Sequence, residues 1–172
     1  MKIIYPFGYT FLDYPSDDGA ALLVQCIGCS HNCKDCSSPL LQDFNYIANN
    51  VHTFSHEVIS TQIIQAVNEM PYNQIVFLGG EPLHPENIEE TKLILEKIKH
   101  LDVALYTGYS LEYVERNEVT GFTFLKCGCY DSDLRVLSEK TDEYIQFAST
   151  NQRLYDSNYN LISDNGRYYF NV

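Results

Sequence analysis

Four short and mostly apolar runs, separated by segments with helical spacing, constrain the fold of this chain most strongly. The runs cover residues 20–25, 74–78, 102–106 and 121–125, and each is followed within three residues by a glycine or a cysteine. Runs of this length, bounded by such residues, are typical of buried strands. Because strands that alternate with helices form parallel β/α units, the pattern predicts an α/β fold.

The segments between these runs carry the start and stop signals of helices. Ser55 can cap a helix whose apolar positions follow helical spacing, and Pro71 should end it. Pro85 suits the first turn of a second helix, which continues through an apolar stripe over residues 88–98. The sequence also predicts a short third helix over residues 112–116.

The chain length limits how complete a barrel these units can form. A closed barrel of eight units takes about 250 residues, and this chain has 172. We therefore expect residues 1–172 to form a single domain, a partial and open parallel β/α barrel with its site at the carboxyl ends of the strands. The open side can admit a macromolecular substrate. Residues 1–20 predict a strand or hairpin, and residues 144–147 and 168–172 predict further strands.

Charge and hydropathy exclude two classes of partner. The formal net charge is -12, and only 11 lysines and arginines are available to displace counterions from phosphates, so we expect no nucleic-acid partner. No apolar run approaches the roughly 20 residues that cross a bilayer, and the N-terminus lacks the apolar stretch of a signal peptide. We expect a cytoplasmic protein, where six cysteines indicate metal ligands or reactive thiols before disulfides.

The densest chemical signal is a loop that holds four of these cysteines. Cys26, Cys29, Cys33 and Cys36 fall within eleven positions, so their thiols can converge on one metal centre. Thiolates favour iron–sulfur clusters or zinc. A structural zinc site with all four thiols is an open alternative, although two zinc knuckles usually need a longer spacer than the three residues found here.

The inner spacing, Cys-x3-Cys-x2-Cys at Cys29, Cys33 and Cys36, resembles that of the radical S-adenosylmethionine superfamily. The resemblance implies that three cysteines hold a 4Fe–4S cluster and leave one iron open for S-adenosylmethionine. It also implies a cofactor-binding role for Asp35 and Ser37, on either side of Cys36. Asp35 departs from the superfamily, which usually has an aromatic residue there.

The fourth thiol of the loop needs a separate explanation. Cys26 follows the first apolar run directly, so packing in the core is the favoured interpretation and a ligand role is the alternative.

The second motif of the same superfamily follows the second strand, at Gly79-Gly80-Glu81-Pro82. The resemblance implies that the backbone of Gly79 and Gly80 and the charge of Glu81 bind the methionyl ammonium of the cofactor. A solvated turn carboxylate is the alternative for Glu81. After the third strand, Thr107 and Gly108 are candidates for binding the ribose or carboxylate, with a plain strand-to-helix turn as the alternative.

Three further residues have no settled role from sequence. Cys127 and Cys129 form a Cys-x-Cys pair after the fourth strand, which indicates ordinary turn cysteines, with a redox pair or a metal site as alternatives. His31 lies inside the cysteine loop and faces either the cofactor or solvent.

Several segments together resemble the activating proteins of anaerobic ribonucleoside-triphosphate reductase. They are Asp13-Tyr14-Pro15, Val24-Gln25, Ser38-Pro39, the glycine motif with Leu83, Tyr106-Thr107-Gly108-Tyr109, Lys126-Cys127-Gly128 and Ser149-Thr150-Asn151-Gln152-Arg153. The residues after Cys36, which are Ser37-Ser38, depart from the pattern common in that family.

The resemblance implies a specific reaction and specific partners. Reductive cleavage of S-adenosylmethionine would give a 5′-deoxyadenosyl radical, which generates a glycyl radical on the large anaerobic reductase subunit. An electron donor such as flavodoxin or ferredoxin would supply electrons to the cluster. The alternatives are activation of another glycyl radical enzyme, a radical reaction on a small molecule as in deazaguanine-forming synthases, and a metal-binding interaction module without catalysis.

Overall fold

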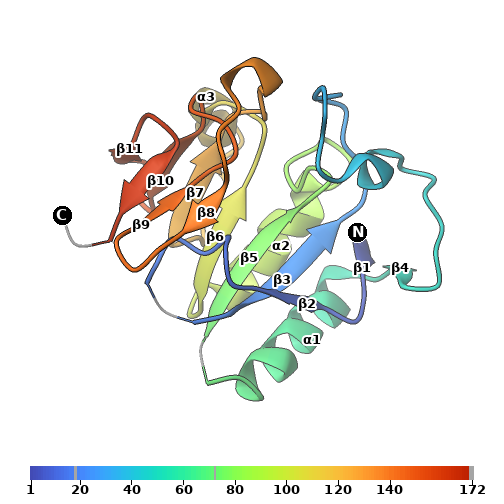
Figure 1. The fold of residues 1–172 in the computed structure, drawn as a ribbon. Coiled ribbons are helices and arrows are strands. Elements are labelled where there is room, and N and C mark those ends of the chain that lie inside the picture. The colour runs from blue at the N-terminus through green and yellow to red at the C-terminus, as the bar shows by residue number, and fades with distance from the viewer. Residues whose placement is uncertain (18, 72, 171–172) are drawn as a thin grey trace.

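The computed structural model describes residues 1–17, 19–71 and 73–170, which form two sheets and three α-helices (Figure 1). Among these residues, the larger sheet has the order β11-β10-β7-β6-β5-β3-β1-β4, with β2 paired to β3. Its strands are β1 (Lys2–Ile4), β2 (Gly8–Thr10), β3 (Ala21–Cys26), β4 (Val51–Thr53), β5 (Gln74–Gly79), β6 (Asp102–Tyr106), β7 (Phe124–Cys127), β10 (Arg153–Asp156) and β11 (Leu161–Ser163). The smaller sheet holds β8 (Glu139–Lys140), β9 (Tyr144–Gln146) and β12 (Arg167–Tyr169).

The centre of the larger sheet is parallel, as the sequence predicts. β3, β5, β6 and β7 lie side by side, and α1 (His56–Asn68), α2 (Ile88–Ile98) and α3 (Leu111–Arg116) make the three crossovers between them. The register places Val24, Phe77, Leu105 and Leu125 in one row across the four strands. All four side chains are fully buried. The predicted α/β fold is confirmed as an open sheet of parallel β/α units flanked by antiparallel strands.

Alternation along the parallel strands gives the sheet two different faces. In β3, Leu22 and Val24 pack into the core beneath the helices, whereas Leu23 and Gln25 line a cavity on the opposite face. The other three parallel strands repeat this division. Their helix-facing residues are Ile75, Phe77, Val103, Leu105, Leu125 and Cys127, and their opposite-face residues are Val76, Leu78, Ala104, Tyr106, Phe124 and Lys126.

The opposite face is closed at one end by the small sheet. Ile145 and Phe147, from and just after β9, pack against Val76 and Ala104 of the parallel strands. Figure 1 shows β8 and β9 in front of β6 and β7, while the three helices lie behind the large sheet. The uncovered part of this face, toward the carboxyl ends of the strands, is the cavity described below.

Two sequence predictions are corrected at the helix starts and strand bounds. Pro85 lies before α2 and not in its first turn, because a turn closed by the His84 carbonyl, which accepts from Asn87 and Ile88, precedes the helix. The fourth strand runs over Phe124–Cys127 and not 121–125, because Gly121 has a φ of +88° and turns the chain beneath α2.

The remaining predictions at the chain ends hold in part. The strand or hairpin predicted in residues 1–20 corresponds to β1 and β2, which both pair with β3, while residue 18 lies outside the described residues. β9 and β12 confirm strands near 144–147 and 168–170, and residues 171–172 lie outside the described part. β10 and β11 extend the sheet beyond what the sequence patterns indicated.

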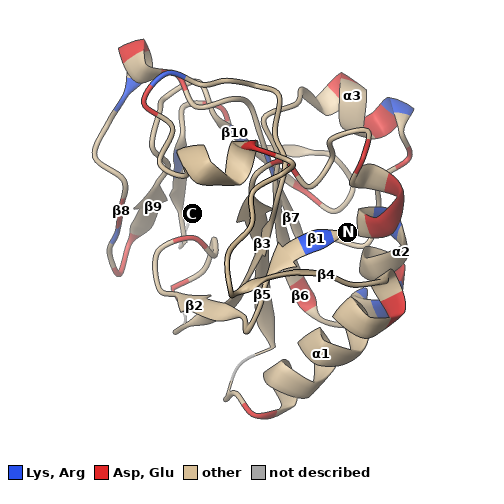
Figure 2. Cartoon of the chain, turned by 90° about the vertical axis from the view of Figure 1, so that its right-hand side faces the viewer, with Lys and Arg blue, Asp and Glu red and all other residues tan. Residues whose placement is uncertain are grey.

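Charged residues lie mainly on the outer elements. Figure 2 shows acidic residues on α2, α3 and the connecting loops, whereas the parallel strands carry few. Over the described residues, no helix combines the length and the apolar character needed to cross a membrane.

Candidate functional site

A cavity of about 740 Å³ opens at the carboxyl ends of the parallel strands. Every residue that the sequence assigned to the site lines it. These residues are Cys29, Cys33, Asp35, Cys36, Ser37, Gly79, Gly80, Glu81, Thr107 and Gly108. They come from three separate strand ends, so the fold brings together what the sequence holds apart. The volume lies within the range of small-molecule sites.

The cysteine loop leaves β3 and is fixed to the segment that follows it. Gly28 donates its N–H to the Leu41 carbonyl at 2.7 Å, and Cys29 donates to the Gln42 carbonyl at 3.1 Å. Cys29, Cys33 and Cys36 are half-buried.

Asp35 has a left-handed backbone, with a φ of 56°. Asp tolerates this region far better than bulky residues do, so it suits this position.

The three loop thiols each accept a backbone N–H, as metal-bound thiolates often do. His31 donates to Cys29, Tyr130 donates to Cys33, and Ser38 donates to the Cys36 sulfur at 3.4 Å. Burial raises the pKa of Cys29 to about 11 and also raises that of Cys33. A cation bound among them is needed to hold these thiols deprotonated at neutral pH.

The glycine turn after β5 packs directly on the start of the cysteine loop. A Cβ on Gly79 would lie 2.7 Å from the Cys26 carbonyl oxygen, and one on Gly80 would lie 2.5 Å from the Gly28 carbonyl oxygen. Gly80 and Glu81 donate their N–H groups to these same two carbonyls, each at 2.8 Å. Only glycine allows this approach, so the two loops form one rigid unit.

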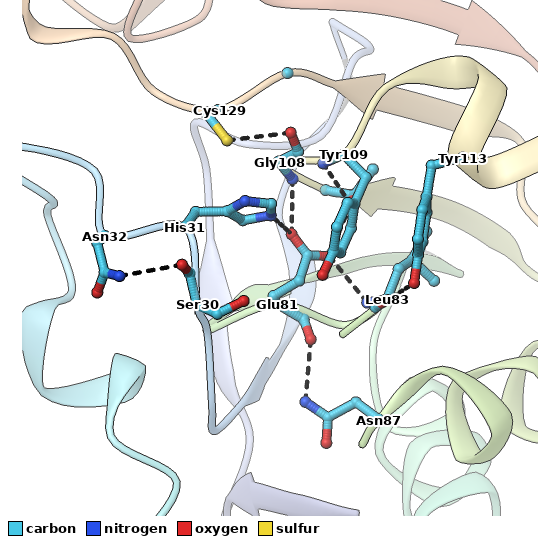
Figure 3. Close-up of polar contacts among 12 residues, drawn as sticks. Ser30, His31, Asn32, Glu81, Leu83, Asn87, Gly108, Tyr109, Tyr113 and Cys129 are labelled. Carbon is cyan, nitrogen blue, oxygen red and sulfur yellow. Dashed lines mark hydrogen bonds and ion pairs between the residues drawn. The ribbon is translucent and has the colours of Figure 1, made fainter. Parts of the chain in front are cut away.

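Glu81 accepts hydrogen bonds at both of its carboxylate oxygens, although it is only 1% exposed (Figure 3). Oε1 accepts from the Leu83 N–H at 2.9 Å and from the Thr107 hydroxyl at 2.7 Å. Oε2 accepts from the Gly108 N–H at 2.7 Å and lies 2.9 Å from Nε2 of His31. Glu81 is therefore not a solvated turn carboxylate.

His31 faces the interior of the site and not solvent. Its ring contacts the Cys129 thiol and the Glu81 carboxylate, which together raise its pKa to about 10. The imidazolium form balances the charge of Glu81 at neutral pH. The ring also packs 4.6 Å from the ring of Tyr109, so aromatic contact fixes its orientation.

Thr107 and Gly108 form a fixed strand end. The Thr107 hydroxyl donates to Glu81 and accepts from the Tyr109 N–H at 3.1 Å. A Cβ on Gly108 would lie 2.5 Å from the His31 ring and 2.9 Å from the Cys129 sulfur. The turn at Gly108 is thus in close contact with both the cysteine loop and the segment that follows β7.

The six cysteines divide by the face of the sheet on which they lie. Cys26 follows the parity of Leu22 and Val24, is fully buried and is absent from the cavity lining. Burial raises its pKa well above the usual value. Cys127 packs in the core beneath the helices, where burial raises its pKa to about 12. Cys129 instead lines the cavity with the three loop cysteines.

Lys126 lines the cavity, although the sequence patterns did not assign it to the site. It is half-buried, and its Nζ lies 4.4 Å from the centroid of the Tyr106 ring. Among the described residues, no carboxylate lies within ion-pair distance of this ammonium. Burial lowers its pKa to about 8. The strand alternation of β7, which places Lys126 opposite Leu125 and Cys127, is the signal that could have identified it.

The donor set suits an iron–sulfur cluster. Three thiols of one loop line one cavity, and each accepts a backbone N–H. Thiolates are the usual ligands of such clusters. Within the described ranges, no three His, Cys, Asp or Glu side chains are gathered closely enough to hold a single metal ion.

Comparison with known proteins agrees with this geometry. The chain is 25% identical to an anaerobic ribonucleoside-triphosphate reductase-activating protein of Haemophilus influenzae, over 61% of this chain and 71% of that protein. It is 23% identical to the protein of that name from Enterobacteria phage T4, over 90% and 92% of the two chains. The Escherichia coli K12 protein of that name is 26% identical over 60% and 68%.

A sequence profile shows to which family these similarities belong. The profile of the 4Fe-4S single cluster domain matches residues 17–155, which include all the strand ends that build the cavity. Since that match covers most of the chain and three thiols of one loop face one cavity, the chain belongs to the 4Fe-4S single cluster domain family.

Proposed function

We propose that this protein is a radical S-adenosylmethionine enzyme that generates the glycyl radical of an anaerobic ribonucleoside-triphosphate reductase. The observation that carries the proposal is the single cavity, which the three loop thiols share with the glycine turn and the two following strand ends. The names of the similar proteins support the choice of reductase as the substrate, because the similarity to the phage T4 protein spans nearly the whole chain.

In this proposal, Cys29, Cys33 and Cys36 ligate the 4Fe–4S cluster and leave one iron without a ligand from the loop. Bound there, the cluster and S-adenosylmethionine supply the reductive cleavage that yields methionine and a 5′-deoxyadenosyl radical. The protein supplies position and exclusion of water. The N–H donors of His31, Tyr130 and Ser38 stabilise the ligating thiolates.

The residues around the cavity offer complementary charges to the methionyl end of the cofactor. The Lys126 ammonium, which lies over the Tyr106 ring, suits the carboxylate, and the carbonyls of Gly79 and Gly80 suit the N–H groups of the amino nitrogen. Glu81 acts chiefly by positioning, because its oxygens already accept four hydrogen bonds.

Asp35, Ser37 and Thr107 are the polar groups proposed to contact the rest of the cofactor. Asp35 and Ser37 are exposed at the rim of the cavity, and Thr107 is buried at its base. We assign Asp35 and Ser37 to the ribose of the cofactor, because the ribose hydroxyl groups can stay partly hydrated at the exposed rim.

The protein substrate would enter through the open side of the sheet. Leu12 and Leu137 line the cavity and are 50% and 79% exposed, so its mouth is partly apolar. An extended glycine-containing loop of the large reductase subunit fits such an opening. We also propose that the chain acts as one domain in the cytoplasm and receives electrons from a carrier such as flavodoxin or ferredoxin.

Anaerobic reconstitution tests this function directly. The chain should bind about four irons and, with dithionite and S-adenosylmethionine, should release 5′-deoxyadenosine. Cys33→Ala should lose both properties, and Cys26→Ala should keep both, because Cys26 faces the helices. Zinc without iron, iron without cofactor cleavage, or turnover of a small molecule in place of the reductase would contradict the proposal.

A further inference from the structure

Cys129 differs from Cys127, the other cysteine outside the loop, because it lines the cavity. It follows β7, where Gly128 turns the chain with a φ of +107° toward the cavity. Its Sγ donates to the Gly108 carbonyl at 3.2 Å (Figure 3). Its own carbonyl accepts from Nδ2 of Asn151 at 2.9 Å. The backbone is therefore held while the thiol points at the cavity.

The Cys129 thiol is in contact with the cysteine loop. It lies within hydrogen-bonding distance of the Cys33 thiol and of the His31 ring. The next residue, Tyr130, donates its N–H to Cys33. Segment 128–130 thus lies against the middle ligand of the cluster site, and a fourth thiol stands in the same cavity as the three loop thiols.

A cluster held by three cysteines has one iron that lacks a protein ligand whenever the cofactor is absent. We propose that Cys129 ligates this iron in the cofactor-free protein and is displaced by S-adenosylmethionine. The inference rests on the cluster site of the proposed function and adds a fourth, exchangeable ligand to it. If Cys129 is this ligand, the cluster retains its fourth iron when no cofactor is bound. The radical reaction then begins only after the cofactor has displaced Cys129.

The exchange is balanced without any redox partner. The iron–sulfur bond to Cys129 breaks, and bonds from the same iron to the amino nitrogen and a carboxylate oxygen of the cofactor form. The methionyl ammonium loses a proton as its nitrogen binds iron, and the Cys129 thiolate gains one. No electron moves in this step, so cleavage of the cofactor remains a separate event.

Controlled oxidation of the reconstituted cluster tests the proposal without measuring activity. Iron content and the electron paramagnetic resonance signal of a three-iron cluster are followed in the wild-type chain and in Cys129→Ala, with and without S-adenosylmethionine. Without the cofactor, Cys129→Ala should lose its fourth iron at least several-fold faster than wild type. With the cofactor, both should be protected equally, because the cofactor then occupies the iron. Cys127→Ala, whose thiol lies in the core, is the matched control and should behave as wild type.

Cys129→Ser separates ligation from the hydrogen bond to Gly108, because a hydroxyl can donate to that carbonyl but is a poor iron ligand. It should lose its fourth iron faster than wild type and no faster than Cys129→Ala. Iron retention like wild type in Cys129→Ala would overturn the ligand role while leaving the cluster site intact. A wild-type chain that binds no four-iron cluster would overturn the proposed function itself.

Discussion

Nε2 of His31 lies 2.9 Å from Oε2 of Glu81, which joins the middle of the cysteine loop to the glycine turn. The same carboxylate accepts from Gly108, at the end of the next strand. One buried side chain therefore sets the relative positions of three segments that belong to three different β/α units. The site depends on this carboxylate for its shape as well as for its charge.

Glu81→Gln should loosen these contacts. The amide can replace only one of the two acceptor oxygens, so at least one N–H or hydroxyl donor loses its partner. We expect the free energy of unfolding to fall by about 1–3 kcal/mol, as measured by urea unfolding, and S-adenosylmethionine to bind more weakly.

Glu86→Gln, at an exposed position in the following turn, is the control and should change neither quantity. Equal stability of the two variants would show that Glu81 does not hold the three segments together.

The contact between the glycine turn and the cysteine loop leaves no room for a side chain. Gly80→Ala would place a methyl group 2.5 Å from the Gly28 carbonyl oxygen. We expect a loss of about 1–3 kcal/mol in stability and a lower iron content after reconstitution, because the cysteine loop must shift. Gly8→Ala meets only the Leu23 side chain, at 3.7 Å, and should retain both properties. Full iron content in Gly80→Ala would contradict the close packing.

Lys126 should make cofactor binding depend on pH. Burial lowers its pKa to about 8, while the groups whose charges it feels, Asp13, Glu81, Cys127 and Cys129, act in the opposite direction. If its ammonium binds the cofactor carboxylate, the dissociation constant should rise as the pH passes about 8. Lys126→Met should bind about tenfold more weakly at pH 7, which corresponds to about 1.4 kcal/mol.

Lys126→Arg is the control for this titration, because arginine stays charged over this pH range. Any ionisation of the cofactor itself would affect the wild type and this variant equally. Calorimetry should show that its affinity changes less between pH 7 and pH 9 than that of wild type. Parallel profiles for the two proteins would exclude Lys126 from carboxylate binding.

The same lysine affects stability with a defined sign. Its folded pKa is lower than the value of about 10.5 in the unfolded chain, so the unfolded chain binds more protons between pH 8 and pH 10.5. Its contribution to the free energy of unfolding therefore rises with pH in that window and is constant below it. Lys126→Met should remove this rise and stabilise the chain at pH 7 by about 1 kcal/mol. Urea unfolding of the wild type and the variant, at pH 7 and within the window from pH 8 to pH 10.5, measures this difference.

The strand pattern was sufficient to predict the parallel sheet, because each central strand is a buried run ended by glycine, cysteine or a polar residue. Alternation within those runs also contained the orientations of Cys26 and Lys126, which follow from residue parity alone. The fourth strand begins later than predicted because Gly121 lies close to Leu95 of α2, which is distant in sequence. No local sequence pattern encodes that proximity.

The role of Glu81 was not predictable for a similar reason. Its donors come from positions 31, 83, 107 and 108, and their convergence depends on how three strand ends align. Sequence motifs identified the residues of the cavity, while the direction of each side chain required the packed sheet. The contact of Cys129 with Cys33 belongs to the same class of long-range information.

The most direct test of the account is electron paramagnetic resonance of an anaerobic ribonucleoside-triphosphate reductase incubated with this protein. The mixture contains the reconstituted chain, S-adenosylmethionine and a reductant under anaerobic conditions, with Cys36→Ala as the matched negative control. The account predicts a glycyl radical signal on the reductase that requires the wild-type chain and grows with released 5′-deoxyadenosine. Cofactor cleavage without any radical on the reductase would contradict the proposed substrate.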